Sequence, residues 1–188
     1  MNSPERIILG IDPGTTVMGY GVLRIKSGKS EFVDLGVINL KSIRDHYLTL
    51  RKIFEEVTRL IEQYLPDELA IESPFFEKNV QSMLKLGRAQ GVAITAAIVR
   101  DIPITEYAPL KIKMAITGQG RASKEQVRGM LCRILKLNEE TLPSFLDATD
   151  GLAAAYCHYL QTASNLNTSE KKYKNWKDFV IKNQAKVR

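Results

Sequence analysis

The predicted fold is centred on the segment Ile7-Ile8-Leu9-Gly10-Ile11-Asp12-Pro13-Gly14. Its first five residues form a short apolar run that is typical of a buried strand, and Asp12-Pro13-Gly14 is a turn signal that ends the strand. Asp12 is therefore expected at the end of a buried strand. A turn role explains this aspartate equally well when it is considered alone.

The rest of the chain predicts a mixed sheet with helices. Two further strands at residues 20–25 and 31–40, joined by a turn at Ser27-Gly28-Lys29, complete an antiparallel meander. Apolar residues recur at helical spacing over residues 45–64 and 80–99, and short strands are expected at 69–72 and 102–107. A capping box of Ser123 and Gln126 predicts a helix to about residue 137, and a last helix is expected over 144–160. This order predicts an α/β fold with a mixed five-stranded sheet and helices on both of its faces.

The charge is divided unevenly along the 188 residues, whose formal net charge is +6. Residues 1–160 are expected to form one domain, and residues 161–188, with seven Lys/Arg against two acids, a basic C-terminal tail. Within the domain, residues 137–160 hold four acids and no lysine or arginine, directly after a basic stretch at 100–136. A basic surface beside an acidic spot suits a protein that holds a polyanion and gathers cations, although solvated surface is the simpler explanation of charge alone.

The spacing of the cysteines and the composition of the N-terminus indicate the cellular compartment in which the protein is expected. Cys132 and Cys157 have neither metal-knuckle nor disulfide-framework spacing, and residues 1–6 lack the regions of a signal peptide. No stretch resembles a membrane span. These observations indicate a reducing compartment, and we expect the protein in the cytoplasm.

Four acids could act together. Asp12 follows the first strand and Glu72 ends the fourth, so parallel pairing of these strands would bring both carboxylates to the same edge of the sheet. Asp147 and Asp150 are three residues apart near the start of the last helix and share a face. Carboxylates gathered without histidine or cysteine form an oxygen site that suits Mg²⁺ or Mn²⁺. Each acid also has an ordinary explanation, as a strand end or as a partner of a helix N-terminus.

The sequence resembles the RuvC family, the bacterial Holliday-junction resolvases. The resemblance covers about residues 6–160, with the family's order and spacing, and is carried by residues 8–14 with 19–21, 71–76, 84–91, 107–109, 117–120 and 146–153. It implies an RNase H-like fold, a homodimer, and Mg²⁺-dependent nicking of four-way DNA junctions in recombination and repair. It also implies a branch-migration motor complex, RuvA and RuvB, as a partner.

The resemblance assigns the catalytic and metal-binding roles to four residues: Asp12, Glu72, Asp147 and Asp150. Two divalent ions about 3.5–4 Å apart can clamp a phosphodiester, one activating water and the other stabilising the leaving oxygen. We therefore expect two Mg²⁺ ions per site, with Mn²⁺ as a substitute.

DNA-binding residues are expected around this site. The family has an aromatic residue at the position of Phe75, which could stack on an unpaired base, and basic residues at the positions of Lys113 and Lys124. Arg121 lies between these lysines in a glycine-rich loop. Arg128 is expected on a solvated helix face.

Two other functions compete with a nuclease. Asp12-Pro13-Gly14-Thr15-Thr16 resembles the first phosphate loop of actin- and sugar-kinase-type phosphotransferases, but such enzymes need a second, similar domain, and the sequence shows no repeat. A non-catalytic junction-binding protein with the same fold is the other alternative, and the presence of all four acids argues against it.

Overall fold

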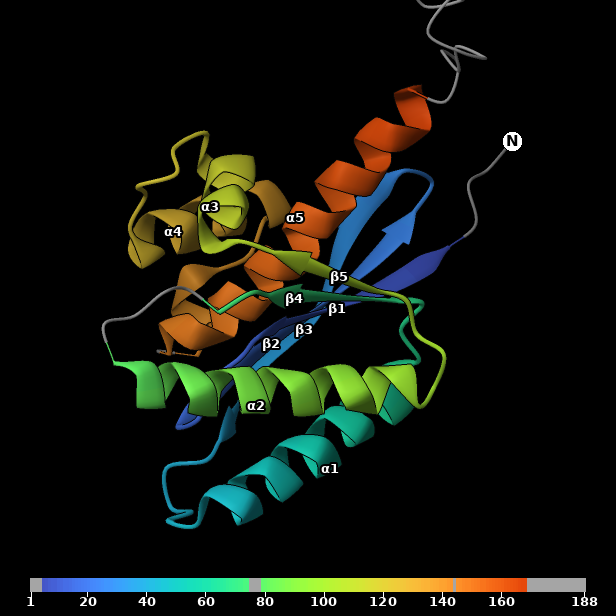
Figure 1. The fold of residues 1–188 in the computed structure, drawn as a ribbon. Helices are drawn as coiled ribbons and strands as arrows, with labels where there is room; N and C mark the ends of the chain where they lie inside the picture. Colours follow the sequence, from blue (N-terminus) through green and yellow to red (C-terminus); the bar gives the residue numbers. More distant parts are fainter. Residues whose placement is uncertain (1–4, 75–78, 144, 169–188) are drawn as a thin grey trace, which may run out of the picture.

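A five-stranded mixed sheet in the order β3-β2-β1-β4-β5 forms the centre of the protein (Figure 1). The computed structural model describes residues 5–74, 79–143 and 145–168. The strands are β1 (Arg6–Asp12), β2 (Val17–Lys26), β3 (Lys29–Asn39), β4 (Glu68–Glu72) and β5 (Ile104–Tyr107). β1 pairs antiparallel with β2, and β2 with β3, whereas β4 runs parallel to both β1 and β5. The predicted meander and mixed sheet are confirmed.

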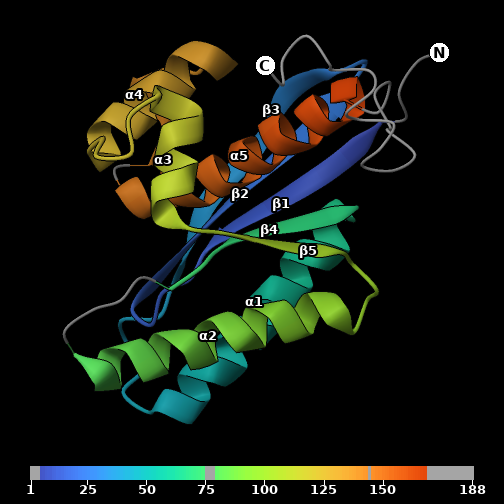
Figure 2. The same cartoon turned by 45° about the horizontal axis from the view of Figure 1, so that its top comes forward.

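Helices cover both faces of this sheet, as the sequence predicts. They are α1 (His46–Tyr64), α2 (Val80–Ile98), α3 (Pro109–Thr117), α4 (Lys124–Leu135) and α5 (Leu146–Thr168), with a short 3-10 turn, η1 (Glu139–Thr141), before α5. α1 and α2 lie on one face, and α5 with α3 and α4 on the other (Figures 1 and 2). Among the described helices, none has the length and apolar character needed to cross a membrane.

Strand alternation directs the first two acids toward α5. Ile8 and Gly10 of β1 face α5, so Asp12, two residues further, continues on that face. In β4, Ala70 belongs to the same core, and Glu72 follows it two residues on. Because β1 and β4 are parallel and Gly10 pairs with Ala70, both carboxylates reach the same edge and face of the sheet.

Helix α5 lies with its backbone directly against the backbone of β1 and β2. A Cβ atom at Gly10 would lie 2.1 Å from the carbonyl oxygen of Gly151, and one at Gly19 would lie 1.8 Å from the carbonyl oxygen of Asp147. Only glycine permits such contacts. These contacts fix the first turns of α5 beside the end of β1.

Two helices differ from expectation. Helix α3 was not among the predicted elements, although Pro109 at its start and Gly118, with φ of 72° after its end, are common helix boundaries. Helix α5 runs on to Thr168 instead of ending near residue 160, and the Thr162 hydroxyl accepts a hydrogen bond from Arg6 at 2.6 Å. The division into a domain and a tail stays a prediction, and residues 169–188 lie outside the described ranges.

The glycine contacts lead to a stability prediction. Gly10→Ala places a methyl group against the backbone of α5 and should lower the free energy of unfolding by about 3 kcal/mol. Gly129→Ala in α4, where a Cβ atom would contact nothing, is the matched control and should raise it by about 0.5–1 kcal/mol. Urea unfolding measures both changes, and equal effects of the two substitutions would contradict the close approach.

Candidate active site

Three carboxylates from distant parts of the chain meet beside the end of β1. Asp12, Asp147 and Asp150 each present an oxygen atom, and these atoms lie within 4.8 Å of one another. Asp147 and Asp150 come from the first turns of α5, one helical turn apart. The glycine contacts that hold α5 on the sheet therefore also bring its two aspartates to Asp12.

Glu72 is the fourth acid of the site. It lies outside the 4.8 Å cluster but lines, with Asp12 and Asp150, a pocket of about 400 Å³. The buried side chain of Gln90 in α2 donates hydrogen bonds to the Glu72 carbonyl at 3.4 Å and to the Glu106 carboxylate at 2.8 Å. Sequence reasoning gave Gln90 no role, although an amide on the sheet-facing side of a helix is a signal that it has a polar partner.

Burial and mutual repulsion raise the pKa values of Asp12, Glu72 and Asp150. Burial, followed by the charges of Glu72 and Asp150, raises the pKa of Asp12 to about 8. Burial, followed by the charge of Asp150, raises the pKa of Glu72 to about 7. Burial also raises the pKa of Asp150, and the hydrogen bond from Lys124 offsets this only in part. Full ionisation of the three acids that line this pocket requires cations near them.

Lysines face the acids from the other side of the pocket. The Lys124 Nζ lies 2.5 Å from Asp150 Oδ2 and 3.1 Å from Asp147 Oδ1. Burial lowers the pKa of Lys124, but its hydrogen bond to Asp150 and the surrounding carboxylates outweigh burial, so the pKa lies above its ordinary value. Lys113 of α3 lines the same pocket. Two of the expected DNA-binding residues therefore lie inside the acidic pocket.

The structure gives different outcomes for Arg121, Phe75 and Arg128. Arg121 is exposed in the loop between α3 and α4, and Phe75 lies outside the described residues. The expectation for Arg128 is wrong: its side chain is buried and donates to the Pro143 carbonyl at 2.8 Å and the Glu139 carbonyl at 3.3 Å. Arg128 thus links α4 to two points of the segment between α4 and α5.

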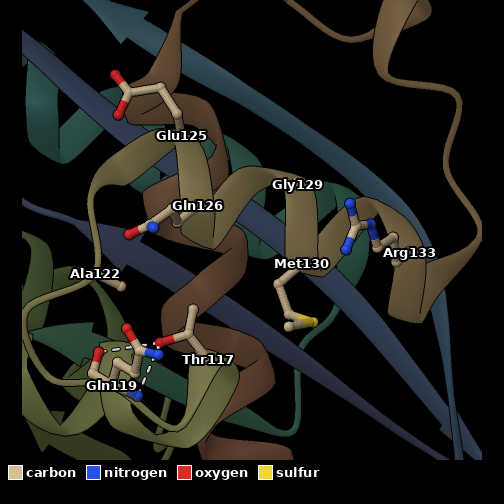
Figure 3. Close-up of a pocket in the computed structure, with 8 residues that line it drawn as sticks. All are labelled: Thr117, Gln119, Ala122, Glu125, Gln126, Gly129, Met130 and Arg133. Atoms are coloured by element: carbon tan, nitrogen blue, oxygen red, sulfur yellow. Dashed lines mark hydrogen bonds between the residues drawn. The ribbon is translucent and has the colours of Figure 1, made fainter.

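A second hollow of about 390 Å³ lies between α3 and α4 (Figure 3). It is lined by Thr117, Gln119, Ala122, Glu125, Gln126, Gly129, Met130 and Arg133. The Gln126 side chain accepts a hydrogen bond from the Ser123 N–H and completes the capping box of α4, while Thr117 and Gln119 bond to each other. None of the four acids lines it, so the acidic pocket is the candidate active site.

The mixed sheet in the order β3-β2-β1-β4-β5, with helices on both faces, is an RNase H-like fold. The family model described as crossover junction endodeoxyribonuclease RuvC matches residues 8–158. The chain belongs to this family, whose members are enzymes.

Similar proteins cover nearly the whole chain. A RuvC of Bacteroides fragilis is 65% identical over 184 residues, which are 98% of this chain and 97% of that protein. A RuvC of Porphyromonas gingivalis is 58% identical over 189 residues, which cover 100% of both chains. The structure of Thermus thermophilus RuvC in complex with a Holliday junction substrate matches with a TM-score of 0.76 and 29% identity, covering 85% of this chain and 96% of that one.

The raised pKa values predict how stability depends on pH when no divalent metal is bound. Unfolded carboxyl groups ionise near pH 4, whereas Asp12 stays protonated in the folded protein to about pH 8. Its stabilising contribution is therefore complete below pH 4 and is lost as pH rises through 8. We expect Asp12→Asn to be more stable than wild type at pH 8 in EDTA, with the difference vanishing toward pH 4.

Urea unfolding between pH 4 and 8 measures this difference. The control is Glu31→Gln, which removes an exposed carboxylate from β3 and should leave the pH dependence unchanged. Adding Mg²⁺ should stabilise wild type more at pH 8 than at pH 5. A constant difference between Asp12→Asn and wild type over this range would contradict the argument.

Proposed function

We propose that the protein is an endodeoxyribonuclease that resolves four-way DNA junctions in recombination and repair by paired symmetric nicks. The observation that carries this function is the meeting of carboxylates from β1, β4 and α5 in one pocket of a RuvC-family fold. The residues proposed as catalytic and metal-binding are Asp12, Glu72, Asp147 and Asp150.

The chemistry of the pocket fits divalent cations. Its acidic groups supply only oxygen atoms, which are the ligands that Mg²⁺ and Mn²⁺ prefer, and burial makes their charges costly without a cation. When bound, two Mg²⁺ ions would activate water and stabilise the leaving oxygen of a phosphodiester. Asp12 and Asp150 belong both to the carboxylate cluster and to the pocket that Glu72 lines, so these two acids connect the site.

Basic side chains next to the acids would hold the DNA backbone. Lys113 lines the pocket, and Lys124 faces Asp147 and Asp150, so a phosphate entering the pocket would meet both ammonium groups. Arg121, exposed between α3 and α4, would extend this contact, and Phe75 would stack on an unpaired base. Affinity would then come largely from the lysines and arginine, and cleavage from the acids.

Two symmetric cuts call for two copies of the site, and we propose a homodimer formed through α2. Leu84 is 48% exposed, and a Cβ atom at Gly87 or Gly91 would contact nothing in the described structure. These glycines are not required by the packing of the domain itself, whereas a second helix could approach closely over them. RuvA and RuvB are the proposed motor partners, and the cytoplasm is the proposed compartment.

Substitution of the acids tests the nuclease. We expect Asp12→Asn and Asp150→Asn to lose at least about a hundredfold in the rate of nicking a synthetic four-way junction with Mg²⁺ and without ATP, because metal ligands serve the chemical step. Junction affinity should stay within a few fold of wild type, and Glu31→Gln should cut normally. A variant that cuts at the wild-type rate would remove its residue from the site, and a wild-type protein that binds without cutting would favour a non-catalytic junction-binding protein.

The dimer is tested at Gly91. Gly91→Arg has room within the domain and should fold normally, but it should give monomers in analytical ultracentrifugation and single, uncoupled nicks on junction DNA. Gly129→Arg is the matched control, because Gly129 is also a helical glycine with open space beside it. A Gly91→Arg protein that stays dimeric would exclude α2 as the interface, and a wild type that is monomeric with and without junction DNA would exclude the dimer.

A further inference from the structure

Lys41 follows the end of β3, at the same edge of the sheet as the acidic pocket. β3 runs in the same direction as β1, since Asn39 pairs with Val17 and Asp12 with Gly19. The buried Leu40 donates its backbone N–H to the Thr16 carbonyl at 2.9 Å. This bond ties the end of β3 to the turn that follows Asp12, and it gives Lys41 a fixed place beside the site.

Phe145 lies next to this lysine at the start of α5. Its ring is 43% exposed, and the Lys41 Nζ lies over it, 5.7 Å from the ring centroid. Phe145 precedes Asp147 by two residues, and Asp147 belongs to the carboxylate cluster with Asp12 and Asp150, so the Lys41–Phe145 pair lies close to this cluster. An aromatic face holds a cation in position without neutralising its charge, as a carboxylate would.

Lys41 differs from Lys124 in its ion pairing. Lys124 forms ion pairs with Asp147 and Asp150, whereas Lys41 has no ion pair within residues 5–74, 79–143 and 145–168. β3 lies two strand spacings, about 10 Å, from β1, and Lys41 lies four residues, about 13 Å, beyond Val37, the β3 residue level with Asp12. A DNA strand spans the resulting distance of roughly 16 Å in about five nucleotides. A strand that crosses the pocket from Lys113 would therefore reach Lys41 on the far side.

We propose that Lys41 binds a backbone phosphate of the DNA on the β3 side of the acidic pocket, and that Phe145 orients its ammonium group for this contact. The proposal rests on the nuclease function proposed above and adds a second anchoring point for the strand. With cations on both sides of the acids, the phosphodiester between them is held at two ends instead of one. Lys41 is thus a DNA-binding residue and Phe145 a positioning residue.

The salt dependence of binding tests Lys41. The dissociation constant for a synthetic four-way junction is measured over about 50–300 mM salt in full-length protein carrying Asp12→Asn, which prevents cutting. We expect Lys41→Ala to reduce the slope of log affinity against log salt by about 0.9, the value for one lost phosphate contact. Lys41→Met, which keeps the length of the side chain, should give the same reduction, and circular dichroism verifies that both variants fold.

The matched control is Lys29→Ala. Lys29 is an exposed lysine at the other end of β3, roughly 35 Å away along the strand, so its removal should leave the slope unchanged. If wild type binds junctions and the variants at Lys41 and Lys29 have equal salt slopes, the proposal for Lys41 is overturned. A wild type that binds a four-way junction no better than linear duplex would instead overturn the proposed function, and this inference with it.

A double-mutant cycle tests the role of Phe145. Phe145→Leu keeps an apolar side chain but removes the aromatic face, and it should weaken binding by about threefold when Lys41 is present. In the Lys41→Ala protein the same substitution should have no effect, because the group that Phe145 orients is gone. Equal effects in both backgrounds would show that Phe145 acts independently and would contradict its positioning role.

Discussion

The structure depends on the contact between the backbone of α5 and the backbones of β1 and β2. Gly10 and Gly19 on the strands, with Gly151 on the helix, let the backbones of these elements meet at these positions without an intervening side chain. As a result, carboxylates that are separated by 135 or more residues in the sequence come within 4.8 Å of one another. A helix held one side chain further away would form the same fold, but Asp147 and Asp150 would not reach Asp12.

Without bound cations, the clustering of these acids makes their ionisation unfavourable. Burial and repulsion work against ionisation of Asp12, Glu72 and Asp150, and Lys124 compensates for only part of this cost. The remaining negative charge favours divalent cations over further lysines, because the ligand atoms are close together and all oxygen. Bringing these carboxylates together lowers the stability of the folded protein, as is common at active sites.

Much of the fold could be predicted because local sequence determines it. The apolar run before Asp12 and the meander gave the correct strands, and the positions of Asp12 and Glu72 at strand ends gave the correct edge. Tertiary contacts account for the rest. Arg128 is buried because the chain near Pro143 folds over it, and the reason for a glycine at position 10 is a helix 141 residues later. Helix α3 was missed although Pro109 and Gly118 mark its ends, because its nine residues show only a weak apolar periodicity.

The central proposal is that the acidic pocket is a cation-dependent nuclease site for branched DNA. The most direct test compares cleavage of a synthetic four-way junction with cleavage of linear duplex of the same sequence, by wild-type protein with Mg²⁺ and with EDTA. We expect paired nicks in the junction that require Mg²⁺, and little or no cutting of the duplex. Equal cleavage of both substrates, or cleavage of the junction in EDTA, would contradict it.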